Sequence, residues 1–145
     1  MVFHLTITGG ESIELQGEII QKAIFKTDTP DDSQARSTNV GFELRIIGKI
    51  IPNGETAPET YKLSLWSLVP AHQADCYRQA TLKVINEGQV VRTIEFPNAF
   101  VVDYTEDYNT GDKTGTFNLY LRQKKDKADQ VKLEKPDAEY EGFSF

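Results

Sequence analysis

The sequence is poor in the residue types that build catalytic and redox sites. Its 145 residues include one cysteine, Cys76, and two histidines, His4 and His72. A single cysteine excludes an internal disulfide framework and fits a reducing compartment, so we expect assembly in the cytoplasm. A lone thiol packs as a small apolar group more often than it acts as a nucleophile, and we expect Cys76 to be buried.

Positive charge and long apolar runs are scarce as well. Lys and Arg total 16 against 22 Asp and Glu, which gives a net charge of -6. A protein that binds nucleic acid through phosphates carries a basic stripe, so we expect no direct nucleic-acid recognition. Apolar runs of only a few residues fall far short of the ~20 residues that cross a bilayer, so we expect no membrane insertion. Residues 1–10 lack a basic region before an apolar stretch, so no signal peptide is expected.

Motifs for chemistry are missing or incomplete. The chain has no G-x-S-x-G nucleophile elbow, and neither histidine is placed between a nucleophile and an orienting carboxylate. Residues 41–49 end in Gly-Lys without the spacing of a phosphate-binding loop. Residues 107–118 lack the bidentate glutamate of a calcium loop. We therefore predict a protein that is not an enzyme and has no catalytic residue, cofactor or metal.

Alternating apolar and polar residues are abundant in the first half. Val2–Thr8 places Phe3, Leu5 and Ile7 on one face, which predicts a half-buried strand. Similar alternation predicts strands over residues 19–27 and 41–51. The second half predicts strands over residues 76–85, 90–96, 99–104 and 114–123, with one turn at Pro97-Asn98.

The connection between the second and third predicted strands is polar and twelve residues long. Asp28–Asn39 contains no large apolar side chain, whereas hairpin loops usually have two to five residues. Asp31, Asp32 and Arg36 give this loop charges of both signs. We therefore interpret it as a contact loop, with a flexible surface loop as the alternative.

One segment has the spacing of a helical face. Tyr61, Leu65, Leu68 and Val69 recur at four, seven and eight residues, which favours a helix whose apolar side faces the core. Pro58 is tolerated in a first turn and Pro70 ends the segment. A strand over the same residues stays open as an alternative.

These elements predict a mainly β protein, an antiparallel β-barrel or two-sheet sandwich with one short α-helix. We expect one β-barrel domain over residues 1–125. Residues 126–145 are expected to form a charged extension, basic at first, then acidic, and aromatic at its end.

The order of these parts resembles the Hcp-like tail-tube family, which comprises the inner-tube protein of type VI secretion systems and the tube proteins of contractile phage tails. The similar stretches are the loop around Arg36, the strand pair of residues 80–85 and 88–94, and Phe96–Tyr104 followed by Glu106. Residues 117–123 resemble the closing strand of that family. The resemblance covers about residues 1–125.

The resemblance implies a structural function. Family members form rings of six copies that stack into a hollow tube, so it implies self-association and contacts with sheath, baseplate or effector proteins. Head-to-tail contacts of this kind close into rings when the rotation permits. A monomeric β-barrel binding module is the alternative, and a small hydrolase is less favoured.

Overall fold

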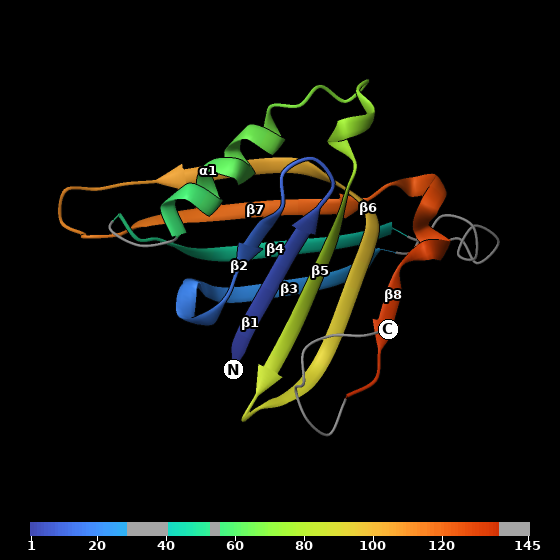
Figure 1. The fold of residues 1–145 in the computed structure, drawn as a ribbon, viewed down its shortest axis with the longest axis horizontal. Coiled ribbons are helices and arrows are strands. Elements are labelled where there is room, and N and C mark those ends of the chain that lie inside the picture. The colour runs from blue at the N-terminus through green and yellow to red at the C-terminus, as the bar shows by residue number, and fades with distance from the viewer. Residues whose placement is uncertain (29–40, 53–55, 137–145) are drawn as a thin grey trace.

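In the described part of the chain, eight antiparallel strands and one α-helix make up the fold (Figure 1). The computed structural model describes residues 1–28, 41–52 and 56–136. The elements in chain order are β1 (Val2–Thr8), β2 (Ile13–Leu15), β3 (Ile20–Asp28), β4 (Gly41–Ile50), α1 (Thr56–Ser67), β5 (Arg78–Asn86), β6 (Gln89–Asp107), β7 (Gly115–Gln123) and β8 (Lys132–Glu134). The sheet order is β2-β1-β5-β6-β7-β4-β3, with β8 pairing to β6. The predicted antiparallel fold class is confirmed.

Strand β6 belongs to both halves of the sheet. Its first part pairs with β5 from Asn86↔Gln89 to Arg78↔Ala99, and its second part pairs with β7 from Ala99↔Gln123 to Asp107↔Thr116. Figure 1 shows β1 and β5 crossing in front of β3, β4 and β7, with β6 curving from one group to the other. Because one strand serves both groups, the sheet folds over on itself and encloses a core between its halves.

The predicted turn at Pro97-Asn98 is wrong, because both residues lie inside β6. Proline lacks an N–H and is tolerated in sheets at bulges. Here the β5–β6 register shifts between Arg78 and Ala80, opposite the proline. The Asn98 N–H donates to the Gln123 side chain at 2.9 Å, and the Asn98 carbonyl accepts from the Lys124 N–H at 2.9 Å. These contacts carry the backbone through the bend without ending the strand.

The core fills the space between the two halves. It contains apolar residues with alternate spacing along each strand, as the sequence pattern predicted for β1, β4 and β7. An aromatic trio closes one side, since the ring centroids of Phe25, Phe42 and Phe96 lie 6.2 Å apart in every pair. The members of the core with no measurable exposure are Leu5, Ile7, Ile13, Leu15, Leu44, Ile46, Leu63, Ala80, Phe96, Ala99, Leu119 and Leu121.

The predicted helix is present, but its predicted facing is wrong. Leu65 and Leu68 are 42% and 75% exposed, and Tyr61 is also exposed. Leu63 and Trp66 face the core instead, at 0% and 1% exposure.

The helix has two apolar stripes, which explains the error. One stripe contains Tyr61 and Leu65, the other Leu63 and Trp66, and each has spacing that suits a helical face. Periodicity alone therefore could not choose between them. Val69, just beyond the helix, is partly buried against the core, as predicted.

Two short strands were not predicted. β2 pairs with β1, and β8 pairs with β6 through Thr93↔Glu134, Ile94↔Leu133 and Glu95↔Lys132. Residues 132–134 of the expected 126–145 extension therefore pair with the sheet, and the domain boundary after residue 125 stays a prediction. Residues 137–145 lie outside the described residues. Among the described helices, none has both the length and the apolar character that crossing a membrane requires.

The buried stripe of α1 predicts a specific stability difference. Leu63→Ala removes a fully buried side chain and should lower the free energy of unfolding by about 2–5 kcal/mol. Leu65→Ala, on the exposed stripe of the same helix, should change it by no more than about 1 kcal/mol. Urea denaturation of both variants measures the difference. Equal losses in the two variants would contradict the facing of α1.

Candidate assembly surfaces

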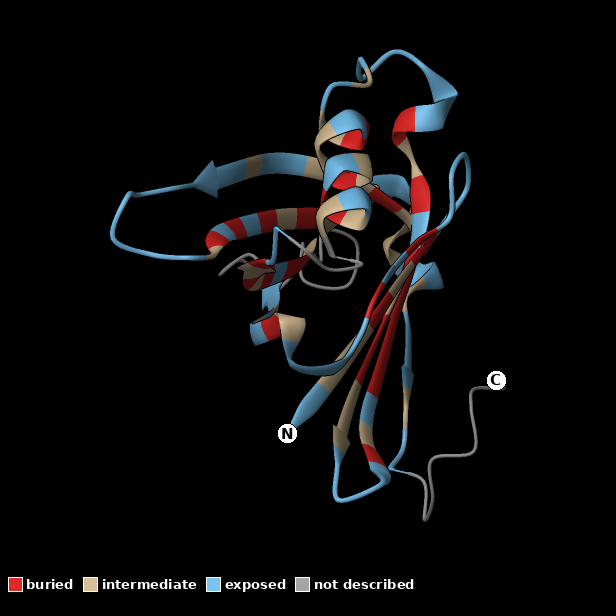
Figure 2. Ribbon diagram, turned by 60° about the vertical axis from the view of Figure 1, so that its left-hand side comes forward, coloured by how far each residue is buried: buried red, intermediate tan, exposed pale blue. Residues whose placement is uncertain are grey.

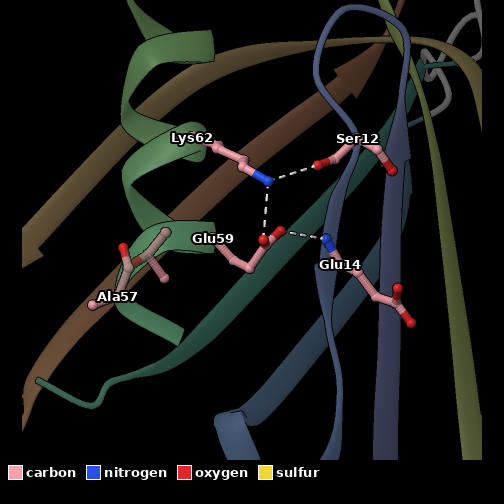
Figure 3. A network of polar contacts seen from close by, with 6 residues as sticks. Ser12, Glu14, Ala57, Glu59 and Lys62 are labelled. Atoms are coloured by element: carbon pink, nitrogen blue, oxygen red, sulfur yellow. Dashed lines mark hydrogen bonds and ion pairs between the residues drawn. The ribbon is translucent and has the colours of Figure 1, made fainter. Parts of the chain in front are cut away.

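The free edge of β2 is covered by α1 (Figure 3). Glu59, in the first turn of the helix, accepts the Glu14 backbone N–H at 2.9 Å. The Lys62 ammonium group donates to Glu59 at 3.0 Å and to the Ser12 carbonyl at 3.2 Å. An unpaired edge N–H is a template for pairing with another chain, and here a carboxylate occupies it. β2 is therefore closed to strand addition at Glu14.

Strand β3 presents the longest open edge. It ends the strand order, so only β4 pairs with it in the part of the chain that the structure describes. Lys22, Ile24 and Lys26 alternate along it and are all exposed. Lysines on an edge discourage indiscriminate pairing. Acidic side chains on a strand that added here would offset the charge of these lysines.

The long loop leaves from the far end of this edge. Asp28 and Gly41 are direct partners across β3 and β4, so the twelve residues between them begin and end at one point of the sheet. Asp31, Asp32 and Arg36 of the predicted contact loop lie outside the described residues.

A charged cluster sits beside this exit point, on the outer face of β4 and β7. The Arg45 guanidinium lies 4.0 Å from the centre of the Tyr120 ring, which is cation–π distance. Arg122 pairs with the buried Glu43 carboxylate at 3.8 Å. Burial, and then the hydrogen bond and charge of Glu43, raise the pKa of Tyr120. These contacts join β4 to β7 close to Gly41, where the loop returns to the sheet.

The opposite side of the molecule carries the β6–β7 hairpin, which extends past α1 (Figure 1). Glu106 accepts both tyrosine hydroxyls near its base, from Tyr104 at 2.6 Å and from Tyr108 at 2.9 Å. Burial and then the Glu106 carboxylate raise the pKa of Tyr104. These contacts stiffen a hairpin that is otherwise exposed, as Figure 2 shows for the end of β6.

Two further sequence hypotheses concern this hairpin and the histidines. The Asn109 side chain accepts the Gly111 and Asp112 N–H groups and so builds the turn. In the described ranges, no group of three or more His, Cys, Asp or Glu side chains could hold a metal ion.

His4 pairs with Glu14 at 2.8 Å on the sheet, while Cys76 is buried beside Trp66. Burial of Cys76 was predicted and is confirmed.

The end of α1 and the residue after it expose apolar side chains. Tyr61, Leu65 and Leu68 contribute exposed apolar area on the side away from the core. Clustered apolar area of this kind marks contact sites when it is contiguous. Their spacing predicted these residues for the core, so this surface was not predicted. The contact of Glu59 was not predicted either, although acidic residues are typical of a first helical turn.

The fold is similar to that of solved tube and Hcp proteins. Hcp1 from Flavobacterium johnsoniae matches with a TM-score of 0.55 and 16% identity, over 85% of this chain and 90% of that one. A chain of an extracellular contractile injection system, the PVC sheath–tube complex in its extended state, matches at 0.52 and 14% identity, over 92% and 88%. An Hcp protein matches at 0.53 and 10% identity, over 93% and 99%. The Hcp-like fold expected from the sequence is confirmed.

Comparison by sequence adds nothing to this likeness. No protein-family model matches the chain, and no curated protein matches it. At identities of 10–16%, the structural match establishes the fold.

The contact between Glu59 and β2 predicts a measurable contribution to stability. Glu59→Ala should lower the free energy of unfolding by about 1–3 kcal/mol, because the Glu14 N–H and the Lys62 ammonium lose a charged partner. Glu59→Gln, which retains an acceptor, should lose less. Glu11→Ala, an exposed position in the preceding turn, should stay within about 0.5 kcal/mol of the wild type. Urea denaturation compares the three, and a Glu59→Ala variant as stable as Glu11→Ala would contradict the role of this contact.

Proposed function

We propose that this chain is a structural subunit of the tube of a contractile injection system or a phage-tail-like particle. Six copies form a ring, and rings stack into a hollow tube. The observation that supports the proposal most strongly is the match to Hcp1 over 85% of this chain. Matches to chains of a sheath–tube complex and of a tube terminator complex point the same way.

The edges of the sheet suit a ring. One edge strand, β2, is short and capped by Glu59, whereas β3 offers nine residues to a neighbour. Where β3 of one copy contacts a different surface of the next copy, the contact is head-to-tail, and such contacts close into rings when the rotation permits. A neighbour on β3 also hides the edge that would otherwise favour aggregation.

Stacking between rings is assigned to the loop that leaves at Asp28 and returns at Gly41. Asp31, Asp32 and Arg36 supply charges of both signs for contacts with the adjacent ring. A single exposed ion pair contributes only ~0–1 kcal/mol, but a ring of six repeats each contact six times. Weak contacts of one subunit therefore add up to firm association of rings.

A tube of this kind would contact sheath, baseplate or effector proteins, and the exposed α1 stripe is available to them. Assembly would take place in the cytoplasm. No hydrolase activity that depends on His4, His72 or Cys76 is part of this function.

We predict the outcome of shortening the loop. Replacing residues 31–38 by a Gly-Ser linker should leave a ring of about 98 kDa, six times the chain mass of 16.4 kDa, because ring contacts lie elsewhere. The wild type should also form larger stacks as concentration rises, whereas the variant should not. Sedimentation velocity over a concentration series measures both species.

A charge-neutral variant is the matched control. Asp31→Asn, Asp32→Asn and Arg36→Gln together keep the loop length and remove these three charges. This variant therefore distinguishes an effect of loop length from an effect of loop charge. Stacks of wild-type size from the shortened variant would contradict the role of the loop. A wild-type protein that sediments only as a monomer would contradict the ring itself.

A further inference from the structure

The outer face of β1, β5 and β6, on the side away from the core, contains buried side chains that are not part of the core. Strand pairing aligns one apolar row across it, formed by Val2, Ile85 and Val90. Val90 is only 2% exposed, yet it does not belong to the core cluster. Figure 1 looks onto this face, and no described helix lies over the end of β5 and the start of β6. The burial of Val90 therefore comes from contacts made on the outer face.

The next row on the same face is polar, and it is buried as well. It aligns His4, Lys83 and Thr93. Lys83 is 6% exposed and Thr93 is 1% exposed. The buried Thr93 hydroxyl has no hydrogen-bond partner in the part of the chain that the structure describes. Lysine is almost never buried in this way unless acceptors surround its ammonium group. Whatever covers this row must therefore bring acceptor oxygens.

Two carboxylates of this face are engaged with other side chains. Glu95 accepts a hydrogen bond from the Gln79 side chain at 2.8 Å and pairs with the Lys132 ammonium at 3.7 Å. Glu14 pairs with His4 at 2.8 Å. A third, Glu134, lies one strand beyond Thr93, at the β8 edge of the face. Lys83 therefore lies near the middle of the face, where an additional carboxylate would meet a cation.

Strand β8 directs the chain toward this face. It is antiparallel to β6, from Glu95↔Lys132 to Thr93↔Glu134, so the chain leaves β8 beside the apolar row. Pro136 has no N–H to donate, so pairing with β6 does not continue through it. Nine residues extended span about 30 Å, whereas β8 and β1 are three strand spacings apart, roughly 14 Å. Residues 137–145 are thus long enough to cross the whole face.

The composition of residues 137–145, which lie outside the described residues, matches what this face requires. The segment has three acidic residues, three aromatic residues and no lysine or arginine. These residues are Asp137, Glu139, Glu141, Tyr140, Phe143 and Phe145. Carboxylates suit the buried ammonium group of Lys83, and aromatic rings suit the apolar row because they bury a large area.

We propose that residues 137–145 cross the outer face of β1, β5 and β6 of the same chain, with acidic side chains beside Lys83 and aromatic side chains over Ile85 and Val90. The contact forms within one copy, since β8 of that copy leads the segment to the face. It is therefore independent of the proposed ring and tube contacts.

Acetylation of the full-length protein by an amine reagent, followed for each lysine by mass spectrometry, tests the proposal. Lys113 and Lys125 are exposed and serve as internal references. In the wild type, Lys83 should react at least about tenfold more slowly than either reference, because the segment must lift before the reagent reaches it. A variant without the aromatic side chains should bring Lys83 within about threefold of the references. Its substitutions are Tyr140→Ser, Phe143→Ser and Phe145→Ser.

A second pair of full-length variants tests the charges. Asp137→Asn, Glu139→Gln and Glu141→Gln together should also accelerate the acetylation of Lys83. The matched control removes three acidic charges from exposed positions elsewhere and should leave the rate unchanged. Its substitutions are Glu11→Gln, Glu18→Gln and Asp129→Asn. Hydrogen exchange within β4 and β7 should equal that of the wild type in every variant, which distinguishes lifting of the segment from unfolding.

Three results would overturn the proposal. The first is a wild-type Lys83 that reacts as fast as Lys113, and the second is an unchanged Lys83 rate in the aromatic variant. The third is protection that disappears when the wild type is diluted to monomers, because a second copy would then supply the cover. A wild type that stays monomeric at every concentration but keeps Lys83 protected would contradict the ring and support this contact.

Discussion

The bend of β6 is the constraint on which the rest of this structure depends. One strand of 19 residues pairs with β5 in its first part and with β7 in its second, and Ala99 pairs with both neighbours. The bend brings the two halves of the sheet face to face and creates the core between them. Figure 2 shows buried positions on the strands of both halves and on the turns of α1 that pack against them. A strand that ended at Pro97 would leave two separate sheets with no shared strand between them.

The same arrangement decides which edges of the sheet remain available. The helix lies where its Glu59 can cap β2. β8 pairs with the first part of β6, on the edge opposite β5. β3 is left as the long edge, and its lysines are exposed. The neighbouring strands β4 and β7 are joined by contacts among Glu43, Arg45, Tyr120 and Arg122. Stability and assembly are thus linked, since the contacts that protect one edge leave the other for a partner.

The sequence predicted the elements with strong local signals and failed where tertiary pairing decides. Alternation along β1 and β4 was sufficient, because their apolar residues alternate into the core. Pro97-Asn98 has the composition of a turn, and only pairing to β7 and the Gln123 side chain keeps it within a strand. β2 and β8 have three residues each, too few for a periodic pattern. The helix was found, but Leu63 and Trp66 could not be distinguished from Tyr61 and Leu65, because both stripes are apolar.

In this fold the β2 edge is capped by Glu59 and β3 remains open, so β3 is the edge that can contact a neighbouring copy. Negative-stain electron microscopy of the wild-type protein at high concentration tests this account most directly. The account predicts rings with a central hole, seen end-on, together with side views of stacked rings. Fields without rings or stacks over a range of protein and salt concentrations would contradict it.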